Sequence, residues 1–272
     1  MTHNDSEQHD DDKPVGRVLS RREVLSLFGG AGAVVIALGA GLRVIPLEQT
    51  ATPAGTAATG AAPTGTALPT CIVRPELTEG PYFVETILNR SDIRVEPSDD
   101  SIVPGMLMKL KVQVMDVTSG DCKPLPGAQV DVWHCDAYGV YSGVAGSPDT
   151  LFLRGYQITD EFGLAEFKTI VPGWYPGRAV HIHFKIRTDP EAERGYGFTS
   201  QWFFDPEQIE TIYAELPYGD RGLPNTPNSR DGIYRSGGEQ LVLDLVPFTE
   251  DEAEEEGESG YTAVFDIGLD LS

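Results

Sequence analysis

The sequence is poor in basic residues. Its 272 residues include 20 Lys and Arg but 42 Asp and Glu, so the formal net charge at pH 7 is −22. A chain of this charge is repelled by the phosphates of nucleic acids and by anionic lipid headgroups. The composition therefore argues against nucleic acid as a partner and suits a soluble, exported protein. Part of the acidity is local, and we expect the run Glu250–Glu256 to be a solvated surface loop.

The sequence also lacks the motifs of several enzyme classes. It contains no internal repeat, no glycine-rich loop that would cradle phosphates and no nucleophile elbow. Cysteine is scarce, with three residues in the chain. Cys71 and Cys122 lie in loop-like surroundings, so we expect this pair to be the one that forms a disulfide outside the cytoplasm. The sequence alone does not determine the connectivity, and Cys135 would then be a buried free thiol at the end of a strand.

The first 70 residues do not read as a folded domain. Residues 1–45 contain Ser20-Arg21-Arg22-Glu23-Val24-Leu25 and then an apolar, Gly/Ala-rich stretch, which resembles a twin-arginine export signal. The signal predicts an extracytoplasmic or secreted protein, and the pattern leaves open whether it is removed or kept as a membrane anchor. A plain anchor and a chance Arg pair are the alternatives. Residues 46–70 form a low-complexity Ala/Thr/Gly/Pro linker, which leaves residues 71–272 as the folded domain.

The residue pattern of this domain predicts a series of short strands. Apolar and polar residues alternate in segments that Gly, Pro, Asp and Ser separate. The spacing predicts an all-β fold, an antiparallel Greek-key β-sandwich of about eight strands, as in prealbumin-like proteins. The expected strands are 108–117, 128–134, 151–159, 164–170, 179–187, 198–204, 240–247 and 261–269.

One short helix is expected directly after the strand 198–204. Asp205 suits the N-cap and Pro206 suits the first turn. The apolar residues of this segment fall on one stripe, which is formed by Ile209, Ile212, Tyr213 and Leu216.

Histidine is scarce, yet two of the five residues, His181 and His183, lie one residue apart on an expected strand. Side chains at positions i and i+2 of a strand point the same way, so both imidazoles can bind one metal ion. Tyr175 precedes them in a shaped Pro/Gly loop, and Tyr141 follows another expected strand. Two imidazoles with two phenolates suit ferric iron better than zinc or calcium. The same alternation is also what any half-buried strand with a water-facing side shows.

Further stretches lie between residues 71 and 204 and become specific only in combination. They are Leu77–Phe83, Val130–Asp136, Gly139–Gly143, Phe152–Gly155, Thr159–Asp160, Pro172–Arg178 and His181–Lys185. Together they resemble the intradiol ring-cleavage dioxygenases, the family of catechol 1,2-dioxygenase and protocatechuate 3,4-dioxygenase. The likeness is greatest to the exported, single-domain members.

The resemblance implies an enzyme of aromatic compound catabolism, an oxidoreductase that incorporates both atoms of O2. It implies one non-haem Fe(III) per chain and cleavage of a catechol-type diol to a cis,cis-muconate-type product. Tyr141, Tyr175, His181 and His183 would be the iron ligands, with Tyr175 leaving on substrate binding and acting as a base. The partners would be the small aromatic diol and O2. Contact with a membrane would occur only through an uncleaved signal, and a homodimer is one assembly that the sequence leaves open.

The resemblance also assigns residues to the substrate pocket. Arg178 would lie over the substrate ring and stabilise its carbanion-like form. Gln201 would lie in the same pocket, although its spacing from His183 is longer than we would expect. Tyr82 either lines the pocket or simply packs, and the loops near Tyr82, Ile102 and Tyr141 would set the substrate preference.

Other residues compete for these roles. Tyr138 lies three residues before Tyr141, but the Gly-x-Tyr-Ser register of the family favours Tyr141. We expect Tyr156 to pack in a strand and His134 to be a hydrogen-bonded structural residue at a strand end. Trp133 is expected to be core or pocket wall.

Two other functions fit parts of the pattern. An exported β-sandwich can be a non-enzymatic binding module, because a fold alone does not give a function. A zinc hydrolase that uses both histidines would need a carboxylate ligand and a general base beside them. Asp189 and Glu191 are the nearby candidates, and both fall beyond the strand.

Overall fold

The computed structural model of this chain describes residues 72–189 and 196–272. The expected export signal, the linker, Cys71 and Glu191 lie outside the described residues. Cys135 is a buried free thiol, as expected. Cys122 is disulfide-bonded, and its pairing with Cys71 stays a prediction. Within the two described ranges, every helix is too short or too polar to span a membrane.

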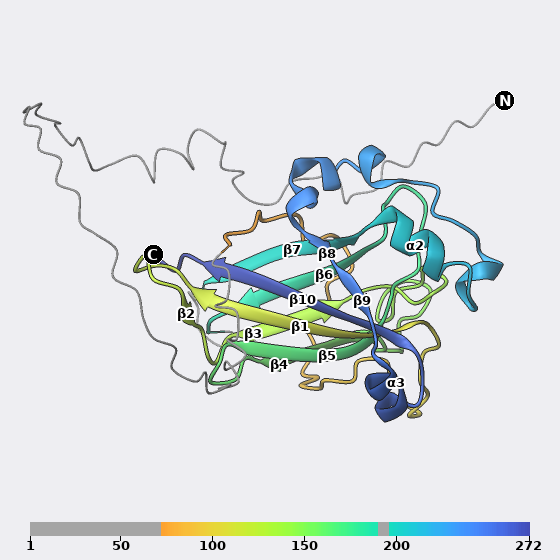
Figure 1. Ribbon diagram of the computed structural model, residues 1–272, viewed down its shortest axis with the longest axis horizontal. Coiled ribbons are helices and arrows are strands. Elements are labelled where there is room, and N and C mark those ends of the chain that lie inside the picture. The colour runs from red at the N-terminus through yellow and green to blue at the C-terminus, as the bar shows by residue number, and fades with distance from the viewer. Residues whose placement is uncertain (1–71, 190–195) are drawn as a thin grey trace, which may run out of the picture. The chain divides into compact units, whose positions relative to one another are not determined.

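The strands form two five-stranded sheets (Figure 1). The first sheet has the order β2-β1-β10-β9, and β5 also pairs with β1. Its strands are β1 (Leu107–Asp116), β2 (Lys123–Pro124), β5 (Leu164–Ile170), β9 (Leu245–Pro247) and β10 (Gly260–Leu269). The second sheet has the order β4-β3-β6-β7-β8. Its strands are β3 (Gln129–Trp133), β4 (Arg154–Ile158), β6 (His181–Arg187), β7 (Gly197–Phe204) and β8 (Val242–Leu243).

The all-β class is confirmed, but the purely antiparallel arrangement is wrong. β1 pairs in parallel with β10 along its whole length, and β7 pairs in parallel with β8. Both pairs join segments that are distant in sequence, so no hairpin turn forces them to run antiparallel. The Greek-key connection stays a prediction.

The described residues contain ten strands rather than about eight. The expected strand 240–247 divides at the exposed Asp244 into β8 and β9, which join different sheets. The two-residue strand β2 was too short to show an alternating pattern and includes a proline.

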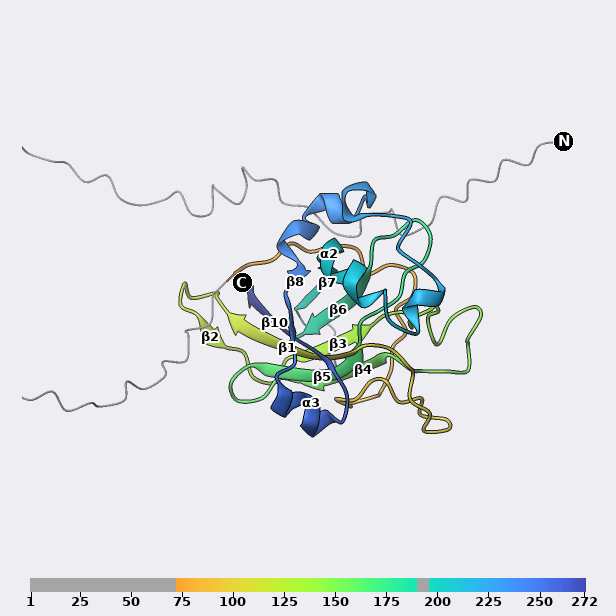
Figure 2. The same cartoon turned by 45° about the vertical axis from the view of Figure 1, so that its right-hand side comes forward.

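The acidic run Glu250–Glu256 is a helix, α3, and not the loop that we expected. Thr249 and Glu252 form a capping box at its start, and Gly257 ends it in the left-handed conformation. The carboxylate of Glu256 binds Lys109 of β1 and Lys168 of β5. Figures 1 and 2 both show α3 beside β5, and these ion pairs explain why the helix lies there.

The predicted helix is present as α2 (Pro206–Ile212). The side chain of Asp205 accepts hydrogen bonds from the backbone N–H groups of Glu207 and Gln208. Ile209, Ile212 and Tyr213 are buried, but Leu216 is 74% exposed because it lies beyond the end of the helix. The apolar stripe was therefore one residue shorter than expected.

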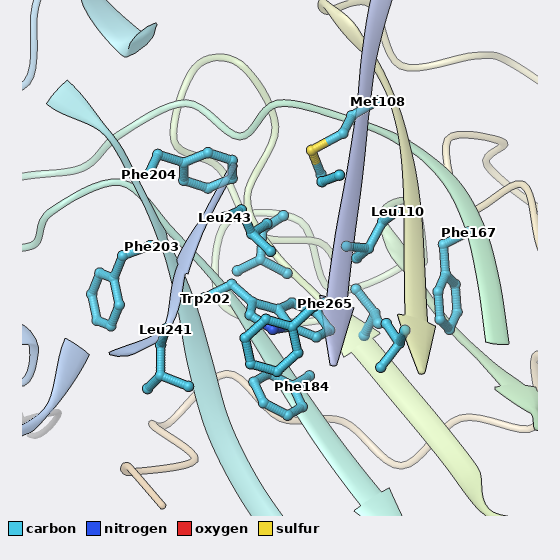
Figure 3. Packing of buried hydrophobic residues seen from close by; sticks show 14 of the residues in the cluster. Met108, Leu110, Phe167, Phe184, Trp202, Phe203, Phe204, Leu241, Leu243 and Phe265 are labelled. Atoms are coloured by element: carbon cyan, nitrogen blue, oxygen red, sulfur yellow. The ribbon is translucent and has the colours of Figure 1, made fainter. Parts of the chain in front are cut away.

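One hydrophobic core receives side chains from both sheets (Figure 3). Phe184 of β6 stacks on Trp202 of β7 with ring centroids 4.0 Å apart. Phe265 of β10, in the other sheet, contacts both rings edge-on at centroid distances of 5.9 and 5.5 Å. Because Phe184 faces this core, its neighbours His181 and His183 point to the opposite side of the same sheet.

Candidate metal centre

At the candidate site, one residue from each of three neighbouring strands lies in a row across the sheet. On β6, His183 pairs directly with Trp133 of β3 on one side and with Gln201 of β7 on the other. Paired residues on adjacent antiparallel strands share a face of the sheet, so these side chains lie side by side. The ring of Trp133 lies parallel to that of His183, with centroids 5.1 Å apart. The long spacing from His183 to Gln201 therefore does not separate them, since strand pairing brings them together.

Two loops bring the phenols to this row. Tyr141 lies on the loop that follows β3, and Tyr175 lies on the loop that precedes β6. Glycines let these loops pack tightly: a Cβ added to Gly173 would lie 2.3 Å from the carbonyl oxygen of Ala137. At Gly139, which has a φ of +79°, a Cβ would lie 2.2 Å from the carbonyl oxygen of Trp174. A side chain at either position would push the two tyrosine loops apart.

The four expected metal ligands converge on the Nε2 atom of His181. The Oη of Tyr175 lies 3.1 Å from it, the Oη of Tyr141 lies 3.5 Å from it, and the Nε2 of His183 lies 3.1 Å from it. None of the four residues is more than 8% exposed. The structure thus brings two phenol oxygens and two imidazole nitrogens together in a buried cluster. The surface alternative for the His-x-His pattern does not hold, because both rings are buried.

The two imidazoles differ in their hydrogen bonds. The Nδ1 of His181 lies 2.7 Å from the carbonyl oxygen of Ala179, and this contact requires Nδ1 to carry the proton. The Nε2 of His181 therefore directs a lone pair at the phenols. The Nδ1 of His183 is buried and has no hydrogen-bond partner. A buried polar atom without a partner is costly, and it is the Nε2 of His183, not this Nδ1, that faces the cluster.

Burial sets the protonation states of the cluster. It lowers the pKa of His181 and of His183 well below the usual value for histidine, and the nearby Arg178 lowers both further. Both imidazoles are therefore neutral and able to bind a cation at neutral pH. Burial, followed by the proximity of Tyr175, raises the pKa of Tyr141 well above 10. Tyr141 would therefore bind as a phenolate only beside a strong Lewis acid.

Two buried arginines lie beside the four candidate metal ligands. Arg178 Nη1 lies 3.3 Å from the Nε2 of His181, and Arg178 Nη2 donates to the Oε1 of Gln201. Arg154 donates to the backbone oxygens of Ser142 and Tyr82, at 2.9 Å from Nε and 2.7 Å from Nη1 respectively. Arg154 therefore ties the Tyr141 loop to the segment that carries Tyr82.

Tyr82 and Phe83 cover the cluster. The ring of Tyr82 stacks on Tyr141 with centroids 4.5 Å apart, and it meets Tyr175 edge-on at 6.1 Å. Phe83 packs against Trp133 at 4.9 Å. Ile102, by contrast, lies in a surface groove with Arg94 and Leu216, so it is not part of this wall.

The competing residues lie elsewhere or have other partners. Tyr138 is 43% exposed, and Tyr156 is part of β4. His134 is buried as expected, and its ring nitrogens lie 2.8 Å from the Cys135 carbonyl oxygen and 2.7 Å from the Thr169 hydroxyl. In the two described ranges, no three His, Cys, Asp or Glu side chains gather as a metal site. The zinc-hydrolase alternative therefore lacks its carboxylate ligand there.

Comparisons with known proteins match this chain to dioxygenases. The family model described as Dioxygenase matches residues 78–209. A catechol 1,2-dioxygenase of Candida albicans is 44% identical over 160 residues, covering 50% of this chain and 49% of its own length. A solved intradiol ring-cleavage dioxygenase from Tetranychus urticae is 29% identical, with a TM-score of 0.60 over 74% of this chain and 97% of the other. These matches support the intradiol ring-cleavage dioxygenase family for residues 78–209, which include the four candidate ligands.

The match to this family is partial in length. A chlorocatechol 1,2-dioxygenase of Pseudomonas sp. strain P51 is 29% identical over 150 residues, covering 48% of this chain and 55% of its own length. The chain thus spans about half the length of the curated relatives that it matches.

Two charged residues beside the site were not predicted from the sequence. Arg154 was noted only as part of a matching stretch, and Asp231 was not noted at all. Asp231 accepts a hydrogen bond from Arg178 Nε at 2.9 Å. It lies in an irregular segment between two short 3-10 helices, and no local pattern distinguishes it from other loop carboxylates.

Proposed function

We propose that this protein is a non-haem Fe(III)-dependent intradiol dioxygenase that cleaves a catechol-type diol with O2 to a cis,cis-muconate-type product. The observation that carries the proposal is the convergence of the Tyr141 and Tyr175 oxygens with the Nε2 atoms of His181 and His183. The similarity of residues 78–209 to this family supports the type of reaction.

The donor set fits ferric iron. Two phenolate oxygens and two neutral imidazoles are ligands that suit iron better than zinc or calcium. The lone pair of His181 Nε2 lies 3.1 Å from the Nε2 of His183, and a cation between these nitrogens and the phenol oxygens would be stabilised by all of them. Tyr141, Tyr175, His181 and His183 would hold the ion. When bound, ferric iron would supply the Lewis acidity that keeps the phenols and the diol deprotonated.

In the proposed reaction, Tyr175 moves a proton. Its Oη would take a proton from one hydroxyl of the diol, which makes Tyr175 the general base of substrate binding. Tyr175 suits this role because it lies on a loop, whereas the histidines lie within the central strand β6. Tyr141 stays in place, since Tyr82 stacks on its ring.

Arg178 supplies a positive charge where negative charge develops. Its Nη1 lies 3.3 Å from the His181 nitrogen, so the guanidinium borders the space where the substrate ring would be held. A fixed cation in a dry site stabilises the carbanion-like form of the ring more strongly than it would in water. The Oε1 of Gln201 accepts a hydrogen bond from the Nη2 of Arg178, and Gln201 would polarise bound oxygen.

The pocket wall favours an aromatic substrate. The side chains packed around the cluster are Trp133, Cys135, Tyr82, Phe83 and Val144, and they are mostly aromatic or aliphatic. Such a wall excludes water and can stack against a flat ring. A small aromatic diol fits this lining better than a sugar or a peptide.

We also propose that the protein is exported by the twin-arginine route, as the motif at Arg21-Arg22 indicates.

Oxygen uptake by the purified, iron-loaded full chain tests this proposal. We expect O2 consumption with catechol, hydroxyquinol or protocatechuate, and one ring-opened diacid formed per O2. Resorcinol is the matched control, because its hydroxyls are not adjacent and it cannot chelate through both. Ring opening beside the two hydroxyls rather than between them, or no uptake with any adjacent diol, would contradict the proposal.

A further inference from the structure

A buried carboxylate lies behind Arg178. Asp231 is 1% exposed, and its Oδ2 accepts hydrogen bonds from Arg178 Nε at 2.9 Å and from the Ala179 backbone N–H at 2.8 Å. Its Oδ1 accepts from the backbone N–H groups of Ile233 and Tyr234 at 2.8 and 3.0 Å. Four donors thus hold this carboxylate in one orientation.

The guanidinium of Arg178 directs its three nitrogens at three different groups. Nε faces Asp231, Nη1 faces the Nε2 of His181, and Nη2 donates to Gln201. A guanidinium is planar and its N–H directions are fixed. Once Asp231 binds Nε, the directions of Nη1 and Nη2 toward the donor cluster are set as well.

Asp231 also acts on the backbone that leads into the ligand strand. The same oxygen that binds Arg178 holds the N–H of Ala179, and the carbonyl of Ala179 binds the Nδ1 of His181. A guanidinium that is 3% exposed also needs a counter-charge, since a buried charge without one is strongly destabilising. Asp231 is placed to supply both the orientation and the charge.

We propose that Asp231 is a positioning residue of the dioxygenase reaction, which holds the Arg178 guanidinium against the donor cluster. Its effect on turnover rests on the function proposed above. Asp231 lies beyond residue 209, where the match to the dioxygenase family model ends. The assignment therefore comes from the hydrogen bonds of this structure.

The first test is Asp231→Asn in the iron-loaded full chain. The amide can still accept from the Ile233 and Tyr234 N–H groups, but it replaces the oxygen that receives Arg178. We expect iron content to stay at the wild-type level, KM to change little, and kcat per bound iron to fall about 10- to 100-fold. The matched control is Asp131→Asn, which breaks another buried pair, Asp131 with Arg187 at 2.9 Å, away from the donor cluster. Equal kcat per iron in the wild type and in Asp231→Asn would overturn the proposal.

A double variant separates positioning from general stability. If Asp231 acts through Arg178, Arg178→Met with Asp231→Asn will have the same kcat per iron as Arg178→Met alone. A further loss in the double variant would overturn the proposal.

A crystal structure of iron-free Asp231→Asn gives a result that does not depend on activity. Movement of the Arg178 guanidinium away from Gln201 supports the positioning role, and an unmoved guanidinium overturns it. If the wild-type protein oxidises no diol, the proposed function fails, while this structure still decides what Asp231 does.

Discussion

Replacing Tyr175 with Phe removes one oxygen from the site and little else. The ring of Tyr175 contacts those of His181, Tyr141 and Tyr82 at centroid distances of 5.5, 5.8 and 6.1 Å, and Phe keeps all three contacts. The contacts that are lost include the one that joins the Oη to the Nε2 of His181 at 3.1 Å and the hydrogen bond with the Tyr141 side chain. A neutral hydrogen bond contributes about 1 kcal/mol. For a domain of this size the iron-free variant should melt within about 8 °C of the wild type.

The effect on turnover should be far larger. If Tyr175 is the base that accepts a proton from the diol, its removal should lower kcat per bound iron by about 10²- to 10⁴-fold. The assay is O2 uptake with catechol, normalised to the iron content of each preparation, next to a thermal melt of the iron-free protein. Tyr138→Phe is the matched control, because it removes a phenol that is 43% exposed, and it should match the wild type. Wild-type turnover per iron in Tyr175→Phe would refute this role for Tyr175.

Three more changes have defined outcomes. Gly173→Ala puts a Cβ 2.3 Å from the Ala137 carbonyl oxygen, so we expect about 1–3 kcal/mol of destabilisation together with a loss of bound iron, measured by urea unfolding and metal analysis. Burial lowers the pKa of His134 from 6.5 to about 4. Between about pH 4 and pH 6.5, this residue is therefore protonated in the unfolded chain and neutral in the folded chain. Stability of the iron-free protein should therefore fall as pH drops from about 6.5 to about 4, by about 1.4 kcal/mol per pH unit from this residue. His134→Gln should show a smaller slope in urea unfolding over this range, and an equal slope would contradict the assignment. Gly257→Ala should lower the free energy of unfolding by about 1 kcal/mol, because a φ of +74° is unfavourable for alanine. No atom lies within 4 Å of the new Cβ, so a clash adds nothing to this backbone cost. In urea unfolding, Gly257→Asn should lower the free energy of unfolding less than Gly257→Ala does.

The sequence predicted those parts of the fold that depend on local patterns. The alternation along β6 identified both the core face, with Phe184, and the opposite face, with His181 and His183. The Asp205-Pro206 pair located the start of α2. These predictions succeeded because the side-chain period of a strand and the capping groups of a helix are properties of neighbouring residues.

Features that depend on distant residues were missed. The segment 250–256 shows no apolar stripe, and part of what holds it as a helix against the sheet is the pairing of Glu256 with Lys109 and Lys168, which lie far away in the sequence. The break at Asp244 is set by two sheets that each bind one half of the expected strand. For the same reason the partnership of Asp231 with Arg178 could not be inferred, since only the folded chain brings them together.

The central claim is that Tyr141, Tyr175, His181 and His183 bind one ferric ion and leave room for an aromatic diol. The most direct measurement is the visible absorption spectrum of the iron-loaded full chain, recorded with metal analysis before and after catechol is added under exclusion of O2. Phenolate ligands to ferric iron should give a broad visible band with one iron per chain, and catechol should shift that band. A colourless protein after iron loading, or a band that catechol leaves unchanged, would contradict the account.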